Sequence, residues 1–305
     1  VLLEPQSTNL ISYSEDFSAT GWLKVNTTIT DDYGISPDGT NNSTRLVFGS
    51  GAAYVNRSEA IGVGDQASSI YVKGISGQIL KFGKGGNVGA GSNFTLNGEW
   101  QRLEQISTNS GTAYHISSNI GGANATEVEV WGAQLENLSY ATSYIPTSGA
   151  IATRLADSVT GAGDATTFNS AEGVLYFEGS SLADSGVTRS LSLFQSGSDF
   201  IKFQYSSASN RVDFVCFSSG ALSCNITKII TNTTDSNKYA LKWKLNDFAL
   251  WINGVEVGTD TSGNTPTGLS TLSFTNEGGS SGNLFSKVKA LAVFNEALTD
   301  SELEC

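Results

Sequence analysis

Methionine is absent from this 305-residue sequence, histidine occurs once and cysteine three times. Three cysteines cannot form the disulfide framework that holds together small secreted domains. The single histidine, His115, excludes a site built from several histidines. Because methionine is missing at position 1 as well, we expect the open reading frame to begin upstream of Val1.

Positive charge is also scarce, with 17 Lys and Arg against 29 Asp and Glu and a net charge of −12. Such a chain repels nucleic-acid phosphates and anionic membrane surfaces. No apolar run approaches the roughly 20 residues that cross a bilayer, and no signal peptide is evident. The sequence therefore predicts a soluble acidic protein with no nucleic-acid partner and no membrane insertion.

Short alternating segments bounded by Gly, Asn, Asp and Ser fill most of the sequence. We predict strands at residues 43–48, 53–60, 67–73, 79–83, 100–106, 112–117 and 127–135, and then at 173–178, 189–194, 200–205, 211–217, 223–230, 238–245, 247–257, 271–275 and 285–294. Many short strands at this spacing are typical of β-sandwiches and jelly rolls. The best helical signal is residues 297–304, where Thr299 and Glu302 have the spacing of a capping box.

Alternation fades between Asn137 and Ser170, a segment with Pro146 and many small residues. We interpret this segment as an ordered connector between two domains of about 150 residues, the usual domain size. The predicted fold is all-β, with two β-sandwich (jelly-roll) domains in tandem at residues 1–150 and 151–305.

Several segments carry a family resemblance. In the first half these are VLLEPQSTNLISYSEDFSATGW, NGEWQRL and VEVWGAQLENLSYATSYIPTSGAIATRLAD. They resemble a recurrent module of bacteriophage tail-fibre and virion-associated proteins that is similar to the jelly rolls of carbohydrate-binding modules. In the second half they are EGVLYFEGSSL, KYALKWKLNDFALWINGVEVGTDTSG and FSKVKALAVFNEALTDSELE. These are similar to concanavalin A-like or laminin G-like lectin domains.

Two cysteines occupy informative positions in the segment RVDFVCFSSGALSCNIT. Its apolar alternation predicts a hairpin around a three-residue turn, Ser219–Ala221, which places Cys216 opposite Cys224 and within reach of a disulfide bond. Two buried free thiols are the alternative, because free cysteine is common in protein cores. We expect Cys305 to be free.

Little in the sequence indicates catalysis. The glycine-rich segment 83–91 matches neither a P-loop nor a dinucleotide fingerprint and is expected to be a flexible strand connection. Paired carboxylates could cleave a glycosidic bond if held about 5 to 10 Å from each other. The acidic pairs that lie close in the sequence are Glu15 and Asp16, Glu127 and Glu129, and Glu302 and Glu304. Acidic residues at i and i+2 of a strand are more typical of a solvated face, and the E-x-D-x-E signature of lectin-fold glycosidases is absent. We expect His115 to have no catalytic role and the protein not to be an enzyme.

The resemblance also implies a cofactor, because carbohydrate-binding jelly rolls commonly hold a structural calcium ion near the first strand. Glu15, Asp16 and Gln134 fall where its ligands would lie, although a carboxylate would be more persuasive than Gln134. Ordinary polar residues at strand ends are the alternative.

Aromatic rings are the expected sugar platforms, because the apolar face of a pyranose stacks on them. Trp243 alternates with leucines and is predicted to lie in the core, whereas Trp251 has the opposite parity to its apolar neighbours and is predicted to face outward beside Asn253. In the first domain the candidates are Tyr54 and Trp100, together with Trp22, Tyr71 and Tyr114. The alternative for each ring is a place in the core.

These observations and the resemblance predict a noncatalytic tail-fibre or other virion surface protein that adheres to host-surface glycans. Its expected partners are a host polysaccharide or glycan, other virion proteins and further copies of itself, and its expected location is extracellular, on the virion. One alternative is an accessory carbohydrate-binding region of a secreted polysaccharide-degrading enzyme. Another is a structural spacer or capsid decoration module.

Overall fold

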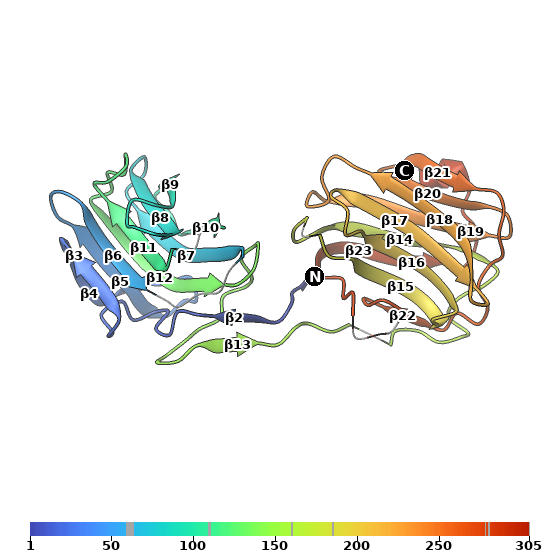
Figure 1. The fold of residues 1–305 in the computed structure, drawn as a ribbon, viewed down its shortest axis with the longest axis horizontal. Helices are drawn as coiled ribbons and strands as arrows, with labels where there is room; N and C mark the ends of the chain where they lie inside the picture. Colours follow the sequence, from blue (N-terminus) through green and yellow to red (C-terminus); the bar gives the residue numbers. More distant parts are fainter. Residues whose placement is uncertain are drawn as a thin grey trace. The chain divides into compact units, whose positions relative to one another are not determined.

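The computed structural model describes residues 1–58, 64–108, 111–159, 161–184, 186–277, 279 and 281–304. The chain forms two compact units, shown in Figure 1. The N-terminal unit is Gln6–Leu155, and the C-terminal unit is Ala156–Cys305 together with Val1–Pro5. Among the described residues, no helix has the length and apolar character needed to span a membrane. Both units consist of antiparallel sheets, so the predicted all-β class is confirmed.

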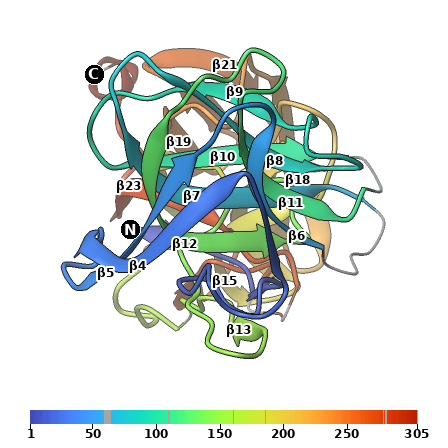
Figure 2. The same cartoon turned by 90° about the vertical axis from the view of Figure 1, so that its left-hand side faces the viewer.

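The N-terminal unit contains two five-stranded sheets and a two-stranded ribbon. One sheet, which we call the front sheet, has the order β10 (Gln101–Ser107), β7 (Gln66–Gly74), β12 (Glu127–Glu136), β5 (Asn41–Phe48) and β4 (Thr27–Ile35). The other, the back sheet, has the order β3 (Trp22–Val25), β6 (Ala53–Ser58), β11 (Ala113–Ser118), β8 (Ile79–Gly85) and β9 (Ser92–Thr95). The ribbon pairs β2 (Ser7–Asn9) with β13 (Ala152–Arg154). Figure 2 faces this unit and shows β4 beside β5.

The core of this unit lies between the two sheets because alternate residues of each strand point inward. The front sheet contributes Ile70, Val72, Val128 and Val130, and the back sheet contributes Val55, Phe82 and Ile116. Two of the predicted candidate rings, Trp22 and Tyr114, are buried in this core. They are therefore packing residues and not sugar platforms.

The C-terminal unit has a six-stranded and a five-stranded sheet. The first has the order β1 (Leu2–Leu3), β23 (Ser286–Phe294), β14 (Glu172–Ser181), β19 (Asn237–Lys244), β20 (Phe248–Ile252) and β21 (Val255–Asp260). The second has the order β18 (Ala221–Ile229), β17 (Arg211–Ser218), β16 (Asp199–Tyr205), β15 (Arg189–Ser196) and β22 (Thr271–Ser273). Trp243 is fully buried between the sheets.

Three details of the C-terminal unit differ from the sequence expectations or refine them. Val1–Pro5 belongs to this unit because β1 pairs with β23. The single strand predicted at 247–257 is a hairpin, since Asn253 and Gly254 both have positive φ and form the turn between β20 and β21. The predicted helix is one turn, α1 (Asp300–Leu303), in which the Thr299 N–H donates to Glu302 Oε2 at 2.8 Å.

Cys216 and Cys224 are direct partners across β17 and β18, the register expected from their parity. The turn between them is different, because Ser218 pairs with Ala221 and the register shifts after Cys216. A two-residue turn with positive φ at Ser219 and Gly220 thus replaces the expected three-residue turn. Both cysteines are free, buried thiols, which is the second of the two alternatives considered for them. Cys305 lies outside the described residues.

Candidate functional site

The outer face of the front sheet, the face turned away from the core, carries a continuous set of polar and aromatic side chains. Inward-pointing Val72 and Val130 alternate with Tyr71 and Lys73 on β7 and with Glu129 and Trp131 on β12. The strand register sets Lys73 opposite Glu129 and Tyr71 opposite Trp131. Side chains from neighbouring strands therefore meet on this face.

A hollow of about 290 Å³ opens on this face. We call it the front hollow; it is lined by Tyr33, Arg45, Lys73, Gly74, Ile75, Ser76, Gly98, Glu127, Val128 and Glu129. Arg45 on β5 forms an ion pair with Glu127 on β12. Lys73 Nζ lies 3.9 Å from Glu129 Oε1, and Ser43 Oγ donates to Glu129 Oε2 at 2.8 Å. Two carboxylates and two cations thus lie side by side in the hollow.

An exposed ring borders these charges because β4 is irregular. Its pairing with β5 shifts register between Thr30 and Gly34, and Asp32 within this bulge has a left-handed backbone conformation with φ at +50°. The bulge presents Tyr33, which is 48% exposed, with the Arg45 guanidinium carbon 5.1 Å from the ring centroid. Tyr33 therefore gives the hollow an apolar surface next to its ion pairs.

Glycine at position 34 is needed for this arrangement. A Cβ built on Gly34 would lie 2.6 Å from Glu129 Oε2, closer than real Cβ contacts. The missing side chain lets β4 approach the carboxylate that also accepts from Ser43. Gly34 thus helps to set the position of Glu129 in the front hollow.

Trp100, one of the predicted candidates, lies near the same hollow. It is half-buried, and its indole Nε1 donates to the carbonyl oxygen of Ile35 at 3.1 Å. Ile35 is two residues beyond Tyr33, and Gly98, two residues before Trp100, lines the hollow. Trp100 therefore connects the loop before β10 to the end of β4 and stabilises the rim.

An aromatic cluster occupies the neighbouring part of the outer face. The ring centroids of Tyr71 and Trp131 are 5.5 Å apart, and those of Trp131 and Tyr144 are 4.5 Å apart. Trp131 is only 6% exposed. Burial is also the largest cause of the raised pKa of Tyr144, so this phenol keeps its proton. The cluster is mainly a packed support, with half-buried Tyr71 as its link to solvent.

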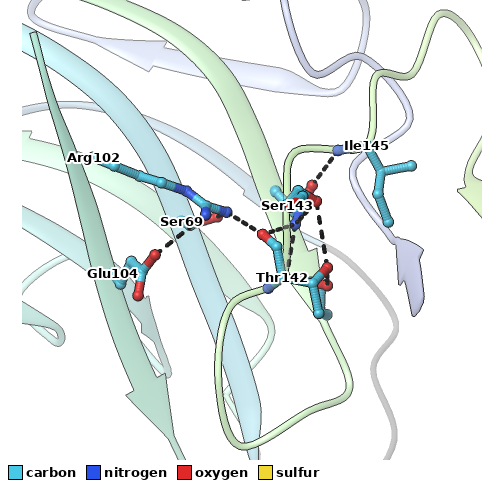
Figure 3. Close-up of polar contacts among 8 residues, drawn as sticks. Ser69, Arg102, Glu104, Thr142, Ser143 and Ile145 are labelled. Carbon is cyan, nitrogen blue, oxygen red and sulfur yellow. Dashed lines mark hydrogen bonds and ion pairs between the residues drawn. The ribbon is translucent and has the colours of Figure 1, made fainter. Parts of the chain in front are cut away.

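A buried polar network lies at the end of this face and includes Gln134, predicted above as a calcium ligand. The Gln134 amide donates to Glu136 Oε2 at 2.8 Å and accepts from the Ile145 N–H at 2.7 Å. Glu136 also accepts from the Thr142 N–H at 3.0 Å. Figure 3 shows the adjoining contacts, in which Arg102 donates to Ser69 and to the carbonyl oxygen of Thr142. This network fixes the segment around Thr142 to the sheet and uses the polar atoms of Gln134 for that purpose.

Glu15 and Asp16, the other two predicted calcium ligands, line a separate acidic hollow of about 450 Å³ with Asp31 and Asp32. Glu15 accepts from Asn42 at 3.1 Å and from the Tyr144 hydroxyl at 2.8 Å. Asp16 Oδ1 accepts from the Ser18 and Ala19 N–H groups. Gln134 does not line this hollow, so the three predicted ligands do not come together.

The donor set does not fit a preformed calcium site. Within the described ranges, no group of three or more His, Cys, Asp or Glu side chains is arranged to hold a metal ion.

The remaining predicted residues lie elsewhere. Trp251 is on the outer face of its sheet as its parity indicated, but it is only 5% exposed because Leu298 and Leu303 pack over it. The expectation of an exposed ring is thereby corrected. Asn253 is exposed, and its side chain joins the β20–β21 turn to β19, because its amide oxygen accepts from the Lys238 N–H at 2.8 Å. Tyr54 is half-buried on the outer face of the back sheet.

His115 is fully buried on β11, where it faces Asn56 across the ladder. Burial, and secondarily the charge of Lys81, lowers its pKa from 6.5 to about 4. The imidazole is therefore neutral at physiological pH. Its Nδ1 lies 3.4 Å from Ser117 Oγ.

Tyr33, Arg45 and Lys73 were not predicted as site residues from the sequence, and the spacing of Glu127 and Glu129 indicated a solvated face. Their i and i+2 spacing does place both carboxylates on one face. The cations that face them come from β5 and β7, which no spacing along β12 reveals. The signal present in the sequence was a set of acidic residues at alternate positions of one predicted strand together with basic residues on two other predicted strands.

Comparisons with known proteins give a likeness of fold. No protein-family model matches the sequence, and no curated protein matches it. The CBM40 module of the Ruminococcus gnavus IT-sialidase is 16% identical over 48% of this chain and 95% of its own, with a TM-score of 0.39. Sheep galectin-11 is 8% identical over 46% of this chain and 100% of its own, with a TM-score of 0.32.

A third similar structure is a prokaryotic β-1,3-1,4-glucanase (lichenase) from a mouse hindgut metagenome. It is 17% identical over 54% of this chain and 66% of its own, with a TM-score of 0.30. All three have jelly-roll or lectin-like folds.

Proposed function

We propose that this protein binds glycans through the front hollow. The observation that carries the proposal is the combination of an exposed ring, Tyr33, with two carboxylate–cation pairs in one open cavity of about 290 Å³. A pyranose presents an apolar face that packs on an aromatic ring and a rim of hydroxyls that both donate and accept hydrogen bonds. Carboxylates accept from those hydroxyls and the cations donate to them, in charge-assisted hydrogen bonds.

We propose binding without bond cleavage. A glycosidase requires one carboxyl group that keeps its proton and serves as general acid. Glu127 forms an ion pair with Arg45, and Glu129 Oε1 lies 3.9 Å from Lys73 Nζ, so both carboxylates are already engaged with cations of the protein. The hollow is therefore better suited to holding hydroxyls than to protonating a glycosidic oxygen.

Each site is expected to be weak. The hollow is open and shallow and presents one exposed ring, so a single copy should bind with a Kd of about 1 mM. Several copies on one particle would raise the avidity by about 10² to 10⁴. An adhesive role is thus served best by an oligomer.

The biological setting that we propose is a virion surface or tail fibre, where the chain would contact other virion proteins and its own copies. The support is the resemblance of ATSYIPTSGAIATRLAD and its flanking segments to tail-fibre modules. A secreted enzyme would instead encode a catalytic domain in the same reading frame. Sequencing the gene upstream of Val1 discriminates the two: structural virion genes around it support the tail fibre, and a fused hydrolase domain contradicts it.

A glycan array tests the binding proposal. Wild type should retain a defined set of glycans, and Tyr33→Ala should reduce every signal about tenfold, because it removes the packing surface and leaves the ion pairs. Tyr54→Ala, on the outer face of the back sheet, is the matched control and should bind as wild type does. Loss of binding in the control with retention in Tyr33→Ala would move the site to the other sheet.

A further inference from the structure

We infer that the front hollow selects neutral glycans and rejects those that carry carboxylate or sulfate groups. This inference rests on the proposed function and names the ligand class of the same site. It is based on how the cations of the outer face are already partnered.

Both cations of the hollow have a carboxylate of the protein as partner. Arg45 is paired with Glu127 across β5 and β12, and its guanidinium also lies against the Tyr33 ring. Lys73 faces Glu129, whose other oxygen accepts from Ser43. The four charges sum to zero, so the hollow offers an anion no net attraction.

The third cation on this face is also engaged. Arg102 Nη1 lies 3.3 Å from Glu104 Oε1, and its other terminal nitrogen donates to Ser69 Oγ at 2.9 Å. It therefore fixes structure at the edge of the face. An incoming anion would meet no uncommitted guanidinium among these three cations.

An anionic sugar would have to displace a carboxylate of the protein and then remain beside it. Like charges placed together in a binding site repel each other, so the two carboxylates oppose such ligands. The net charge of −12 adds a long-range repulsion that slows their approach. Sugar hydroxyls meet neither obstacle, because each can accept from a cation and donate to a carboxylate without breaking the ion pair.

The test compares pairs of glycans with and without a carboxylate, such as sialylated lactose with its carboxylate free or converted to the methyl ester, and glucose polymers against their uronate forms. On one array, wild type should favour the neutral member of each pair at least tenfold. In Glu127→Gln/Glu129→Gln, which frees Arg45 and Lys73, the preference should fall below about threefold or reverse.

A double variant in the C-terminal unit provides the control for net charge. Glu172 and Glu178 pair with Lys244 and Lys289, so Glu172→Gln/Glu178→Gln makes the same change in charge and releases two lysines elsewhere. It should keep the preference of wild type. A similar switch in this control would show that net charge alone decides and would overturn the inference.

Other outcomes separate the inference from the proposed function. Binding that is mainly to acidic glycans and is lost in Tyr33→Ala would refute the neutral selectivity while leaving the site in place. Binding of neutral glycans that Tyr33→Ala does not change would refute the site and the inference with it. A complete lack of binding would refute the proposed function and, with it, the inference that rests on it.

Discussion

Gly34→Ala should alter the front hollow without unfolding the protein. The added Cβ would lie 2.6 Å from Glu129 Oε2, whereas ordinary contacts begin at 3.4 Å, so the oxygen must withdraw by about 0.8 Å. That movement lengthens the hydrogen bond from Ser43, now 2.8 Å, at a cost of about 1 kcal/mol. Replacing a strand glycine by alanine returns about 0.5–1 kcal/mol of backbone entropy. The free energy of unfolding should therefore change by less than about 1 kcal/mol.

Glycan affinity should respond more strongly than stability. A hydrogen bond to a charged group contributes about 1.5 kcal/mol or more, which is about tenfold in affinity, and a displaced Glu129 carboxylate loses it. Isothermal titration with the best array glycan and urea denaturation measure the two effects separately. Gly86→Ala is the control, because a Cβ there meets nothing within 4 Å. Gly34→Ala with unchanged affinity, or with a loss of stability above about 3 kcal/mol, would refute this reasoning.

Four further predictions concern other parts of the chain. His115 has a pKa of about 4 in the folded protein and 6.5 in the unfolded chain, so below pH 6.5 the unfolded chain takes up a proton that the folded protein does not. The free energy of unfolding should therefore fall by about 3 kcal/mol between pH 6.5 and pH 4. Urea denaturation should show a flatter pH dependence in His115→Gln. Trp251→Ala should destabilise the C-terminal unit by about 3–5 kcal/mol because the ring is packed, and unchanged thermal unfolding with lost adhesion would restore its role as a sugar platform. Burial raises the pKa of the Cys224 thiol to about 12 and that of the Cys216 thiol further. In a Cys305→Ser background, a thiol reagent should therefore label neither cysteine in the native protein and both cysteines after unfolding. An unfolded protein that is not labelled would indicate a disulfide. Calcium should bind the acidic hollow with a Kd of about 1 mM or weaker, because its ligands are not gathered beforehand, and a micromolar Kd by calorimetry would contradict this.

The core strands were predictable because burial imposes strict alternation on them. The strand that carries the proposed site was not predicted. β4 is an edge strand with mostly exposed residues, so no apolar alternation marks TTITDDYGI, and its bulge at Asp32 breaks the period. Tyr33 was not predicted as a candidate ring for the same reason. Edge strands near binding sites are where sequence periodicity is least informative.

Strand parity and side-chain exposure proved to be separate questions. The parity of Trp251 was correct, but Leu298 and Leu303, which cover it, come from a segment more than forty positions away in the sequence. Gln134 follows a register shift after Trp131, which re-aims the strand, and the segment around Thr142 then covers it. Both outcomes depend on tertiary contacts that local patterns do not contain.

The most direct measurement is a crystal structure of the full chain with the best array glycan bound. The account predicts a neutral sugar ring packed on Tyr33, with its hydroxyls within hydrogen-bonding distance of Arg45, Glu127 and Glu129. A glycan seated on the C-terminal unit, or on the back sheet beside Tyr54, would contradict it.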